Sequence, residues 1–588
     1  MLNFLKSILS TVLGMVIGFF LILFIGLGII VALSEGDGET IVKENSILKI
    51  TLSDPIIDRG SDNPIDFDIL SMESKNKMGL TDILNSIEKA KTDDRIKGIY
   101  MNVEMPNASL ASLEEIREKL LEFKSETDKF IIAYSEIYSQ KAYYITSVAD
   151  EVYLHPEGIL EFVGLAYQGM FYKGALEKLD IEPQIIRHGK FKAAVEPYML
   201  DKMSDENRQQ ITKFLKSIWS NMLADISESR KISTDELFQI VQQFKVRKAS
   251  DAVTLGLIDA NLYKDQVLDS LRQKLNIEAD EKIEVTGLAA YKNVKLEENK
   301  KKYSKDKIAI IYAYGEISGG EGDDENIGSE RISRAIRDAR TDEKVKAIVL
   351  RVNSPGGSAL ASETILREMI LAKAEKPIVV SMGDVAASGG YYIACHADTI
   401  VANPTTITGS IGVFGLLMNT QKLMKNKLGI TIDTVRTNKY ADMGSMFRSL
   451  TIKERNIIQK SVEDIYDTFI THVSEGRSMS KEAVDAIGQG RVWTGTDARD
   501  LGLVDVLGGF EDAIDLAANM ANLENYRISY LPKKIDPMEE LIKDLTGGAK
   551  VSILENELGE SYQLYKEINN ILEMDEVQMR MPYFFEIN

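Results

Sequence analysis

The chain repeats itself at a distance of about 248 residues. Four pairs of segments match in the same order, with offsets that drift from 249 to 246. They are DDRIKGIYMNVE (93–104) with DEKVKAIVLRVN (342–353), YYITSVADEVYLHP (143–156) with YYIACHADTIVANP (391–404), SESR (227–230) with SEGR (474–477), and VRKASDAVTLGLID (246–259) with VWTGTDARDLGLVD (492–505). This period is far longer than that of a solenoid repeat. The pattern therefore predicts two tandem domains of one fold.

Each copy has the same alternation of apolar strands and amphipathic helices. A short apolar strand opens it (SILKITL, KIAIIYAYGEI), and a second strand follows a helical stretch (KGIYMNV, KAIVLRV). A helix (SLEEIREKLLEFK, SETILREMILAKA) then leads to a third strand (KFIIAYS, KPIVVSM). Strands that alternate with helices at this spacing are typical of right-handed βαβ crossovers. We expect an α/β fold with a parallel sheet in each domain.

The N-terminus carries a long apolar segment. Residues 8–33 contain no charged side chain, and a helix of this length would span about 39 Å, enough to cross a bilayer core of about 30 Å. The apolar part of a signal peptide is usually ~7–15 residues, so a retained anchor is favoured over a cleaved signal peptide. Lys6 precedes the segment and acidic residues follow it, which favours a cytoplasmic N-terminus with the rest of the chain outside.

These features predict the following organisation, in chain order. It comprises a cytoplasmic N-terminus (1–7), a transmembrane anchor (8–33), a linker (34–44), the first α/β repeat (45–291), a lysine-rich linker (292–307), the second α/β repeat (308–535) and a C-terminal tail to which the sequence assigns no role (536–588).

Composition excludes several classes of function. The formal charge of −20 argues against nucleic-acid binding, which requires clustered Lys and Arg. The single cysteine, Cys395, excludes an intramolecular disulfide and any Cys-rich metal site, and is expected to be a small buried apolar residue. Four scattered histidines make a zinc centre improbable. We expect no metal and no cofactor.

Two glycine-rich turns follow successive strands of the second copy. NSPGGS (353–358) follows AIVLRV, and GDVAASGG (383–390) follows PIVVSM. Ligands bind at the carboxyl ends of strands in open parallel sheets, so these turns are a candidate site. Ser388 would be a nucleophile, with the Gly357 and Gly389 N–H groups placed to stabilise an oxyanion. The residues alone fit equally well with a tight packing turn that has no chemistry.

No histidine lies in a sequence pattern that is typical of a general base for such a serine. His396, eight residues after Ser388, is expected on the surface of a helix that begins after the serine, facing away from it. The other known solution is a lysine, which acts as a base only if burial keeps it neutral.

Four motifs together resemble signal peptide peptidase A in its long, duplicated form. They are NSPGGS, GDVAASGGYY, ANPTTITGSIGVFG and RHGKFKAAVEPY. The resemblance runs from the N-terminal anchor through both repeats to about residue 530. It implies a membrane-anchored bacterial serine protease with a Ser/Lys dyad, built from two tandem domains like those of Clp protease and crotonase.

The resemblance also implies a role for individual residues. Ser388 matches the nucleophile, and Lys192, the second lysine of GKFKAAVEP, matches the general base. Ser410 of TGSIG matches the residue that orients the lysine. Gly357 and Gly389 match the oxyanion donors, and no motif residue departs from the pattern.

The repeat indicates how these residues are divided between the two copies. Ser388 falls on Gln140 in the first copy, and Lys192 falls on Ala441 in the second. Each copy thus lacks the half of the dyad that the other retains. The complementary losses predict one composite site, with the base from the first repeat and the nucleophile from the second.

The implied substrates are remnant signal peptides and similar peptides, at the extracytoplasmic side of the bacterial inner membrane. A homo-oligomer, with a homotetramer as one option, is implied by the resemblance alone. Two alternatives remain open. One is an inactive anchored scaffold of the same fold, and the other is an acyl-CoA enzyme of the crotonase type.

Overall fold

The structure is a computed structural model that describes residues 41–60, 67–68, 73–74, 77–296, 304–534 and 577–581, with a few isolated positions before residue 22. Within these residues, no helix combines the length and the apolar character that a bilayer crossing requires. Most of the predicted anchor (8–33) and most of the predicted tail (536–588) lie outside the described residues.

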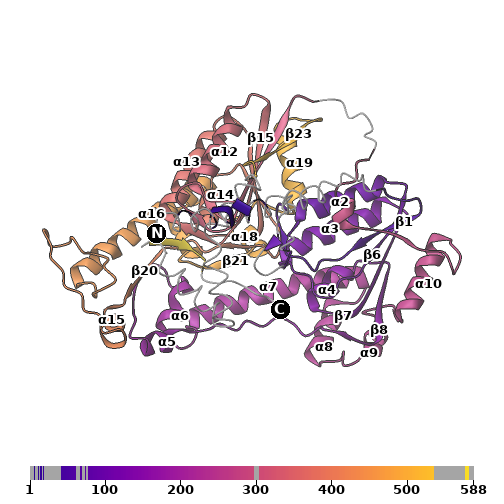
Figure 1. The fold of residues 1–588 in the computed structure, drawn as a ribbon, viewed down its shortest axis with the longest axis horizontal. Coiled ribbons are helices and arrows are strands. Elements are labelled where there is room, and N and C mark those ends of the chain that lie inside the picture. The colour runs from indigo at the N-terminus through magenta and orange to yellow at the C-terminus, as the bar shows by residue number, and fades with distance from the viewer. Residues whose placement is uncertain are drawn as a thin grey trace.

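Two main sheets carry the two repeats, and they have the same strand order. The first is β10-β8-β7-β6-β1-β11, and the second contains β22-β18-β17-β15-β12-β23, with β19 and β21 added beside β17. Strands at the same place in the two orders also occupy the same place along the two copies. The duplication seen in the sequence is therefore a duplication of sheet topology. Figure 1 shows the two repeats side by side, the first in indigo to magenta and the second in pink to orange.

The strands of the first sheet are β1 (Ser46–Ile50), β6 (Ile96–Met101), β7 (Phe130–Tyr138), β8 (Glu151–Leu160), β10 (Ala260–Asn261) and β11 (Glu284–Gly287). Those of the second are β12 (Lys307–Tyr314), β15 (Val345–Ser354), β17 (Ile378–Ala387), β18 (Thr399–Ala402), β19 (Ile407–Gly409), β21 (Val492–Thr494), β22 (Val506–Leu507) and β23 (Arg527–Leu531). Two short ribbons pair β2 (Ile56–Ile57) with β5 (Met78–Gly79) and β3 (Phe67–Asp68) with β4 (Glu73–Ser74).

The helices of the first repeat are α2 (Leu80–Thr92), α3 (Leu110–Glu126), α4 (Gln140–Thr146), α5 (Lys173–Lys178), η1 (Ala193–Val195), α6 (Glu196–Met199), α7 (Asp205–Arg230), α8 (Thr234–Gln242), α9 (Ala249–Thr254), α10 (Lys264–Leu275) and α11 (Leu288–Tyr291). Those of the second are α12 (Ser329–Thr341), α13 (Ala359–Lys373), α14 (Gly389–Ala394), α15 (Gln421–Lys427), α16 (Ile452–Arg477), α17 (Lys481–Ile487), α18 (Gly495–Asp500) and α19 (Phe510–Met520).

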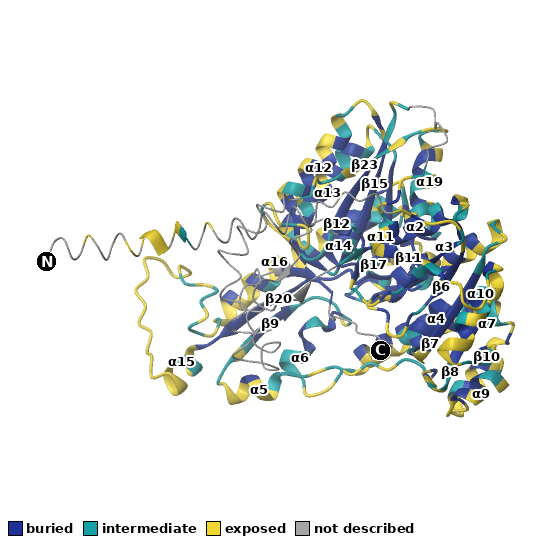
Figure 2. Ribbon diagram, turned by 45° about the vertical axis from the view of Figure 1, so that its right-hand side comes forward, coloured by how far each residue is buried: buried dark blue, intermediate teal, exposed yellow. Residues whose placement is uncertain are grey.

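Helices cover both faces of each main sheet, so the central strands are apolar on both sides. In β12, Ala309 and Ile311 belong to the core cluster shared with α12 and α13, whereas Ile308 and Ile310 belong to the cluster shared with α19. This two-residue alternation between two buried faces is what a continuous apolar run in a parallel strand predicts. Figure 2 shows the central strands of both sheets as largely buried.

A third sheet joins the two repeats. Its order is β14 (Ile327–Gly328), β13 (Ile317–Ser318), β16 (Gly356–Ser358), β24 (Val577–Arg580), β20 (Phe414–Asn419) and β9 (Glu182–Arg187). Strand β9 of the first repeat pairs antiparallel with β20 of the second along its whole length. This pairing brings the segment that follows β9 onto the second repeat.

A buried ionic network adds a second connection between the repeats. The Arg351 guanidinium on β15 donates to Asp58 at 2.7 Å and to Glu115 at 2.8 Å, and all three side chains are almost fully buried. Nearby, the Asp384 carboxylate accepts from the backbone N–H and the hydroxyl of Ser112. Because buried charges are tolerated only when paired, this network constrains how the two repeats dock.

The predicted strands and helices of both copies are confirmed at β1, β6, α3 and β7 and at β12, β15, α13 and β17. The helix predicted after Ser388 is shorter than expected. The helix after Ser388 ends at Ala394, so His396 lies in the turn beyond it and is half-buried rather than on a helix surface. The turn packs against α16, where a Cβ at Gly476 would lie 2.2 Å from the Cys395 carbonyl oxygen.

Candidate active site

Ser388 stands at the turn between β17 and α14. Its backbone has φ 55° and ψ −114°, a conformation that side-chain-bearing residues rarely adopt, and it is fully buried. Its N–H donates to the Gly409 carbonyl, and its carbonyl accepts from the N–H of Tyr392 in the first turn of the helix. Strain of about 1–3 kcal/mol at such a position is typical of functional sites.

Lys192 reaches the second repeat from the loop after β9. The loop is held by backbone bonds across the two repeats, from His188 N–H to Val413 at 3.1 Å and from Phe191 N–H to Gln489 at 3.0 Å. Lys192 directly precedes the short helix η1 and is fully buried. The antiparallel pairing of β9 with β20 thus carries a first-repeat lysine into a second-repeat pocket.

The structure brings three of the predicted site residues into contact within one chain. Lys192 Nζ lies 2.8 Å from Ser388 Oγ and 3.0 Å from both the hydroxyl and the carbonyl oxygen of Ser410. A neutral amine has two N–H donors and one lone pair. The Ser410 carbonyl can only accept, so it takes one N–H, and the lone pair remains available for a serine hydroxyl proton.

Electrostatics favour that neutral amine. Burial lowers the pKa of Lys192 well below its ordinary value, and desolvation is the cause. A buried ammonium is costly unless a carboxylate pairs with it, whereas the partners here are hydroxyl and carbonyl oxygens. The buried site therefore favours the neutral form of the amine, which is the form that can accept a proton.

The two glycine-rich turns meet at this site. A Cβ at Gly356 would lie 2.7 Å from the Gly389 nitrogen, so the turn 355–358 approaches the residue after Ser388 closely. Gly357 belongs to β16, which pairs with β13. The predicted oxyanion donors Gly357 and Gly389 thus come from turns in contact, one at the end of β15 and the other at the end of β17.

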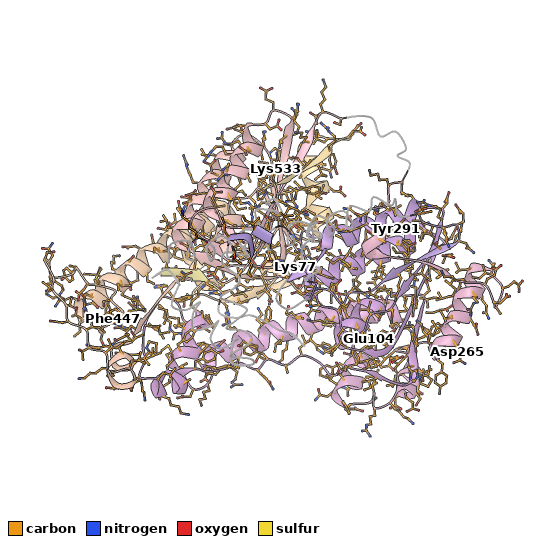
Figure 3. The ribbon with its side chains drawn as sticks, viewed as in Figure 1. Lys77, Glu104, Asp265, Tyr291, Phe447 and Lys533 are labelled. Carbon is orange, nitrogen blue, oxygen red and sulfur yellow. The ribbon has the colours of Figure 1, made fainter. Side chains whose placement is uncertain are left out.

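The positions equivalent to Ser388 and Lys192 in the other repeat hold neither a second nucleophile nor a second lysine. Gln140, the counterpart of Ser388, is buried, and its side-chain oxygen accepts from the N–H groups of Val163 and Gly164 at 3.1 and 2.8 Å. Ala441, the counterpart of Lys192, is exposed in the segment between α15 and α16. Figure 3 labels Phe447, which belongs to that segment, at one end of the molecule and Asp265 of α10 at the other.

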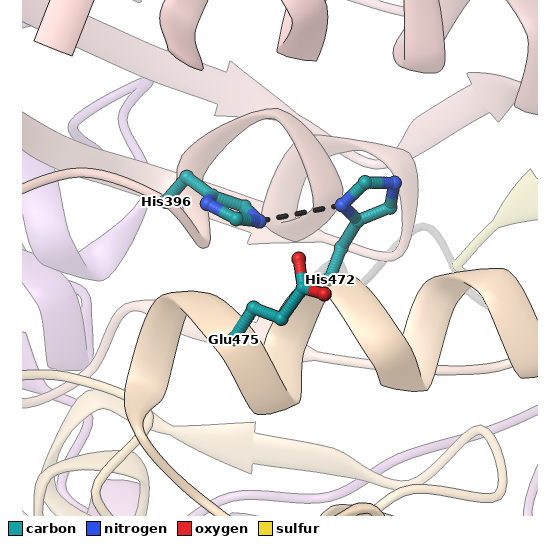
Figure 4. Close-up of side chains that lie close together, drawn as sticks. All are labelled: His396, His472 and Glu475. Atoms are coloured by element: carbon teal, nitrogen blue, oxygen red, sulfur yellow. Dashed lines mark hydrogen bonds between the residues drawn. The ribbon is translucent and has the colours of Figure 1, made fainter. Parts of the chain in front are cut away.

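Three of the four histidines contact groups other than Ser388. His188 packs its ring against Tyr466 at a centroid distance of 4.0 Å. His396 Nε2 lies 3.3 Å from His472 Nδ1, with Glu475 beside them (Figure 4). The expectation that the four histidines are scattered is therefore wrong for His396 and His472, because the fold packs α16 against the turn that follows α14.

Sequence reasoning missed the residues that shape the lysine pocket. A Cβ at Gly490 would lie 2.5 Å from the Lys192 Cβ, and one at Gly412 would lie 3.2 Å from its Cδ. Gly412 is the last residue of the TGSIG motif, which was a usable signal. Gly490 lies 298 positions after Lys192 and in none of the four motifs, so the sequence carried no such signal for it.

Comparison with known proteins agrees with this geometry. A model of peptidase family S49 matches residues 123–278 and 370–524. Protease 4 of Salmonella typhi is 35% identical over 93% of this chain and 90% of its own length, and Protease 4 of Haemophilus influenzae is 38% identical over 76% and 74%. The chloroplastic serine protease SPPA of Arabidopsis thaliana is 35% identical over 82% of this chain and 70% of its own.

Likeness to solved structures is weak. A ClpP1 mutant from Listeria monocytogenes has a TM-score of 0.25 at 16% identity, covering 35% of this chain and 94% of its own. A TM-score at this level carries no argument about this chain. The two matched segments fall one in each repeat and the relatives span most of the chain, so this protein belongs to peptidase family S49 and is a serine peptidase.

Proposed function

We propose that Ser388 is the nucleophile of this peptidase and that Lys192 is its general base. The contact that carries the proposal is the 2.8 Å approach of the buried Lys192 amine to Ser388 Oγ. Ser388 Oγ attacks the scissile carbonyl carbon while Lys192 takes the hydroxyl proton. The same lysine then protonates the leaving amine and later activates the water that hydrolyses the acyl-enzyme.

Two further roles complete the proposed mechanism. Ser410 holds the lysine amine through its hydroxyl and carbonyl oxygens, which directs the lone pair toward Ser388. The N–H groups of Gly357 and Gly389 stabilise the oxyanion that forms during attack. Removing one such donor typically slows an enzyme by about 100- to 1,000-fold.

We further propose that the chain is anchored in the bacterial inner membrane by residues 8–33 and acts on remnant signal peptides at the extracytoplasmic side. The uncharged 26-residue segment supports the anchor. An anchored site is well placed for substrates that remain in the bilayer. A homo-oligomer that encloses several sites belongs to the same proposal, and sedimentation of the detergent-solubilised chain tests it.

Hydrolysis of a synthetic signal peptide by the full-length chain in detergent tests the dyad. Wild type is compared with Ser388→Ala and Lys192→Met, and circular dichroism checks that each variant folds. We expect both variants to lose at least about 1,000-fold in kcat/KM. Unchanged hydrolysis by Lys192→Met would assign the base elsewhere, and unchanged hydrolysis by Ser388→Ala would leave the serine as a turn residue.

A further inference from the structure

Two histidines and a glutamate gather where α16 packs against the turn that follows α14. His396 lies in that turn, and His472 and Glu475 lie on α16. Each side chain offers one possible ligand atom, and the three atoms lie within 4.8 Å of one another. Figure 4 shows the Glu475 carboxylate pointing toward the two imidazole rings. Because residues three positions apart on a helix share one face, α16 can supply two ligands to the same ion.

The distance between the two imidazoles fits a shared metal ion better than a direct hydrogen bond. His396 Nε2 and His472 Nδ1 lie 3.3 Å apart. Hydrogen bonds from N–H groups in proteins usually join atoms about 2.7–3.2 Å apart. Two nitrogens bound tetrahedrally to Zn²⁺ at about 2.0–2.1 Å are separated by about 3.3–3.4 Å. The Glu475 side chain is exposed, so a change of rotamer can bring its carboxylate to a similar distance.

A second carboxylate prepares His472 to bind a metal through Nδ1. His472 Nε2 lies 3.3 Å from Glu363 Oε2 on α13, and the Tyr392 hydroxyl donates to the same carboxylate oxygen. A neutral His472 that keeps its proton on Nε2 for Glu363 presents the lone pair of Nδ1 toward His396. Histidines that bind metals commonly donate their other N–H to a carboxylate, which fixes the tautomer and the orientation of the ring.

The backbone and the neighbouring rings hold the two halves of the cluster together. A Cβ at Gly476 would lie 2.2 Å from the Cys395 carbonyl oxygen and 3.1 Å from the His396 Cα, so α16 approaches the turn this closely only with glycine there. The Tyr392 ring meets the His472 ring edge-on at a centroid distance of 5.4 Å. The two imidazoles are therefore positioned by packing before any metal binds, which lowers the cost of assembling a site.

The first repeat forms the same junction with no histidine at either position. By the offset of 248, His396 falls on Val148, and by the offset of 247, His472 falls on Asp225. Val148 is buried, and the Asp225 carboxylate on α7 accepts directly from the Tyr144 hydroxyl at 2.6 Å. Because this fold packs the helix against the turn without histidines, packing alone does not account for the pair in the second repeat.

We propose that His396, His472 and Glu475 bind one divalent transition-metal ion, with Zn²⁺ as the metal. Two imidazole nitrogens and a carboxylate oxygen suit a borderline metal such as Zn²⁺, whereas Ca²⁺ and Mg²⁺ prefer oxygen ligands alone. With three protein ligands, water takes the fourth tetrahedral position. This proposal departs from the expectation of no metal, which rested on the spacing of the histidines along the chain.

The proposed role of the ion is structural. The six residues of α14, about 9 Å of helix, separate the cluster from Ser388, so the ion does not touch the reacting atoms. Helix α16 also contacts the strand that leads to Lys192, because Arg455 donates to the Ile185 carbonyl of β9 at 2.7 Å. An ion that fastens α16 to the turn after α14 therefore stabilises the helix that lies against both parts of the dyad. The inference itself does not depend on the dyad.

Calorimetric titration of ZnCl₂ into the full-length chain tests the site. The chain is kept in detergent, carries no polyhistidine tag and is first dialysed against EDTA. We expect one Zn²⁺ per chain for wild type, loss of binding for His396→Ala, and at least about tenfold weaker binding for Glu475→Gln and for Glu363→Gln. His155→Ala is the matched control, because His155 lies in the first repeat against Tyr263 and its variant should bind Zn²⁺ like wild type.

Two further measurements do not depend on peptide hydrolysis. We expect Zn²⁺ to raise the unfolding temperature of wild type and His155→Ala but not of His396→Ala. Co²⁺ in place of Zn²⁺ should give the visible absorption bands of a tetrahedral site in wild type and lose them in His396→Ala. Circular dichroism without metal checks that each variant folds, and the exposed position of Glu475 keeps Glu475→Gln informative if His396→Ala unfolds.

Three outcomes would overturn the metal site. A wild-type chain that binds no Zn²⁺ leaves the two imidazoles as a hydrogen-bonded pair. Equal affinity in wild type, His396→Ala and Glu475→Gln places the bound Zn²⁺ elsewhere on the chain. Ca²⁺ that binds as tightly as Zn²⁺ assigns binding to acidic side chains, because the imidazole ligands favour the transition metal.

Discussion

Gly490 lies so close to Lys192 that a Cβ on the glycine would come within 2.5 Å of the lysine Cβ. Gly490 also has φ 83°, so alanine there meets both backbone strain and a steric clash. We expect Gly490→Ala to displace the lysine and lower kcat/KM by about 100-fold, since a shift of about 1 Å at a catalytic group has this effect. Steady-state hydrolysis of a signal peptide measures it.

Gly502 provides a control in which alanine causes backbone strain but no steric clash. Its φ is 77°, and no heavy atom lies within 4 Å of where its Cβ would be. Gly502→Ala should therefore destabilise the chain by only about 1–2 kcal/mol and leave kcat/KM unchanged. If both variants kept full activity, the pocket formed by Gly490 would not position the lysine.

The pH dependence of hydrolysis reports the protonation of Lys192. The amine acts as a base only when neutral, and its pKa is lowered by burial. We therefore expect kcat/KM to rise with pH through a value well below the ~10.4 of a free lysine and then to level off. A rate that rises only near pH 10 would mean that the lysine stays charged in the free enzyme.

Lys192 also affects stability in a pH-dependent way. Its pKa is lower in the folded chain than in the unfolded chain, so between those two values the unfolded chain binds the extra proton. The free energy of unfolding therefore rises with pH across that window. We expect Lys192→Met to unfold at a higher temperature than wild type at pH 7, with the gap closing toward pH 10. Thermal unfolding followed by circular dichroism at several pH values measures this, and a gap that does not change with pH would contradict it.

Ser410 contacts the Lys192 amine through both its carbonyl oxygen and its hydroxyl. Loss of the hydroxyl therefore removes only one of these two contacts. Ser410→Ala removes the 3.0 Å contact with the hydroxyl and retains the one with the carbonyl. The lost hydrogen bond is worth about 0.5–1.5 kcal/mol, which predicts a fall in kcat of about 2- to 13-fold. A loss as large as that of Lys192→Met would show instead that Ser410 takes part in proton transfer.

The ion pairs of Arg351 with Asp58 and Glu115 are expected to stabilise the docking of the two repeats. Arg351→Ala leaves the buried carboxylates of Asp58 and Glu115 without their cation, and breaking a buried pair costs about 3–5 kcal/mol. Urea unfolding measures the loss. Lys460→Ala is the control, because the Lys460–Asp464 pair is largely exposed and should contribute less than about 1 kcal/mol. Equal effects of the two variants would mean that the network does not stabilise the interface.

Much of the fold and of the site was accessible from the sequence. The apolar runs of β12, β15 and β17 and the repeated motifs predicted two parallel sheets of one topology, and the structure has them, with β21 added antiparallel at the edge of the second sheet. Ser388 was visible because a serine among glycines after a strand is a local pattern. Lys192 was visible only through its motif and through the absence of a lysine at Ala441, because nothing local distinguishes it from Lys190.

What the sequence by itself determined is therefore what local patterns encode: the duplication, the strand–helix alternation and the residue types of the site. Only the tertiary structure decided which distant segments meet. The pairing of β9 with β20 brings Lys192 to Ser388 across 196 positions, and the insertion of β24 places Met579 at the same turns. Such contacts depend on complementary shapes and free strand edges formed by residues far apart in the chain. These contacts cannot be predicted from any period or spacing along the chain.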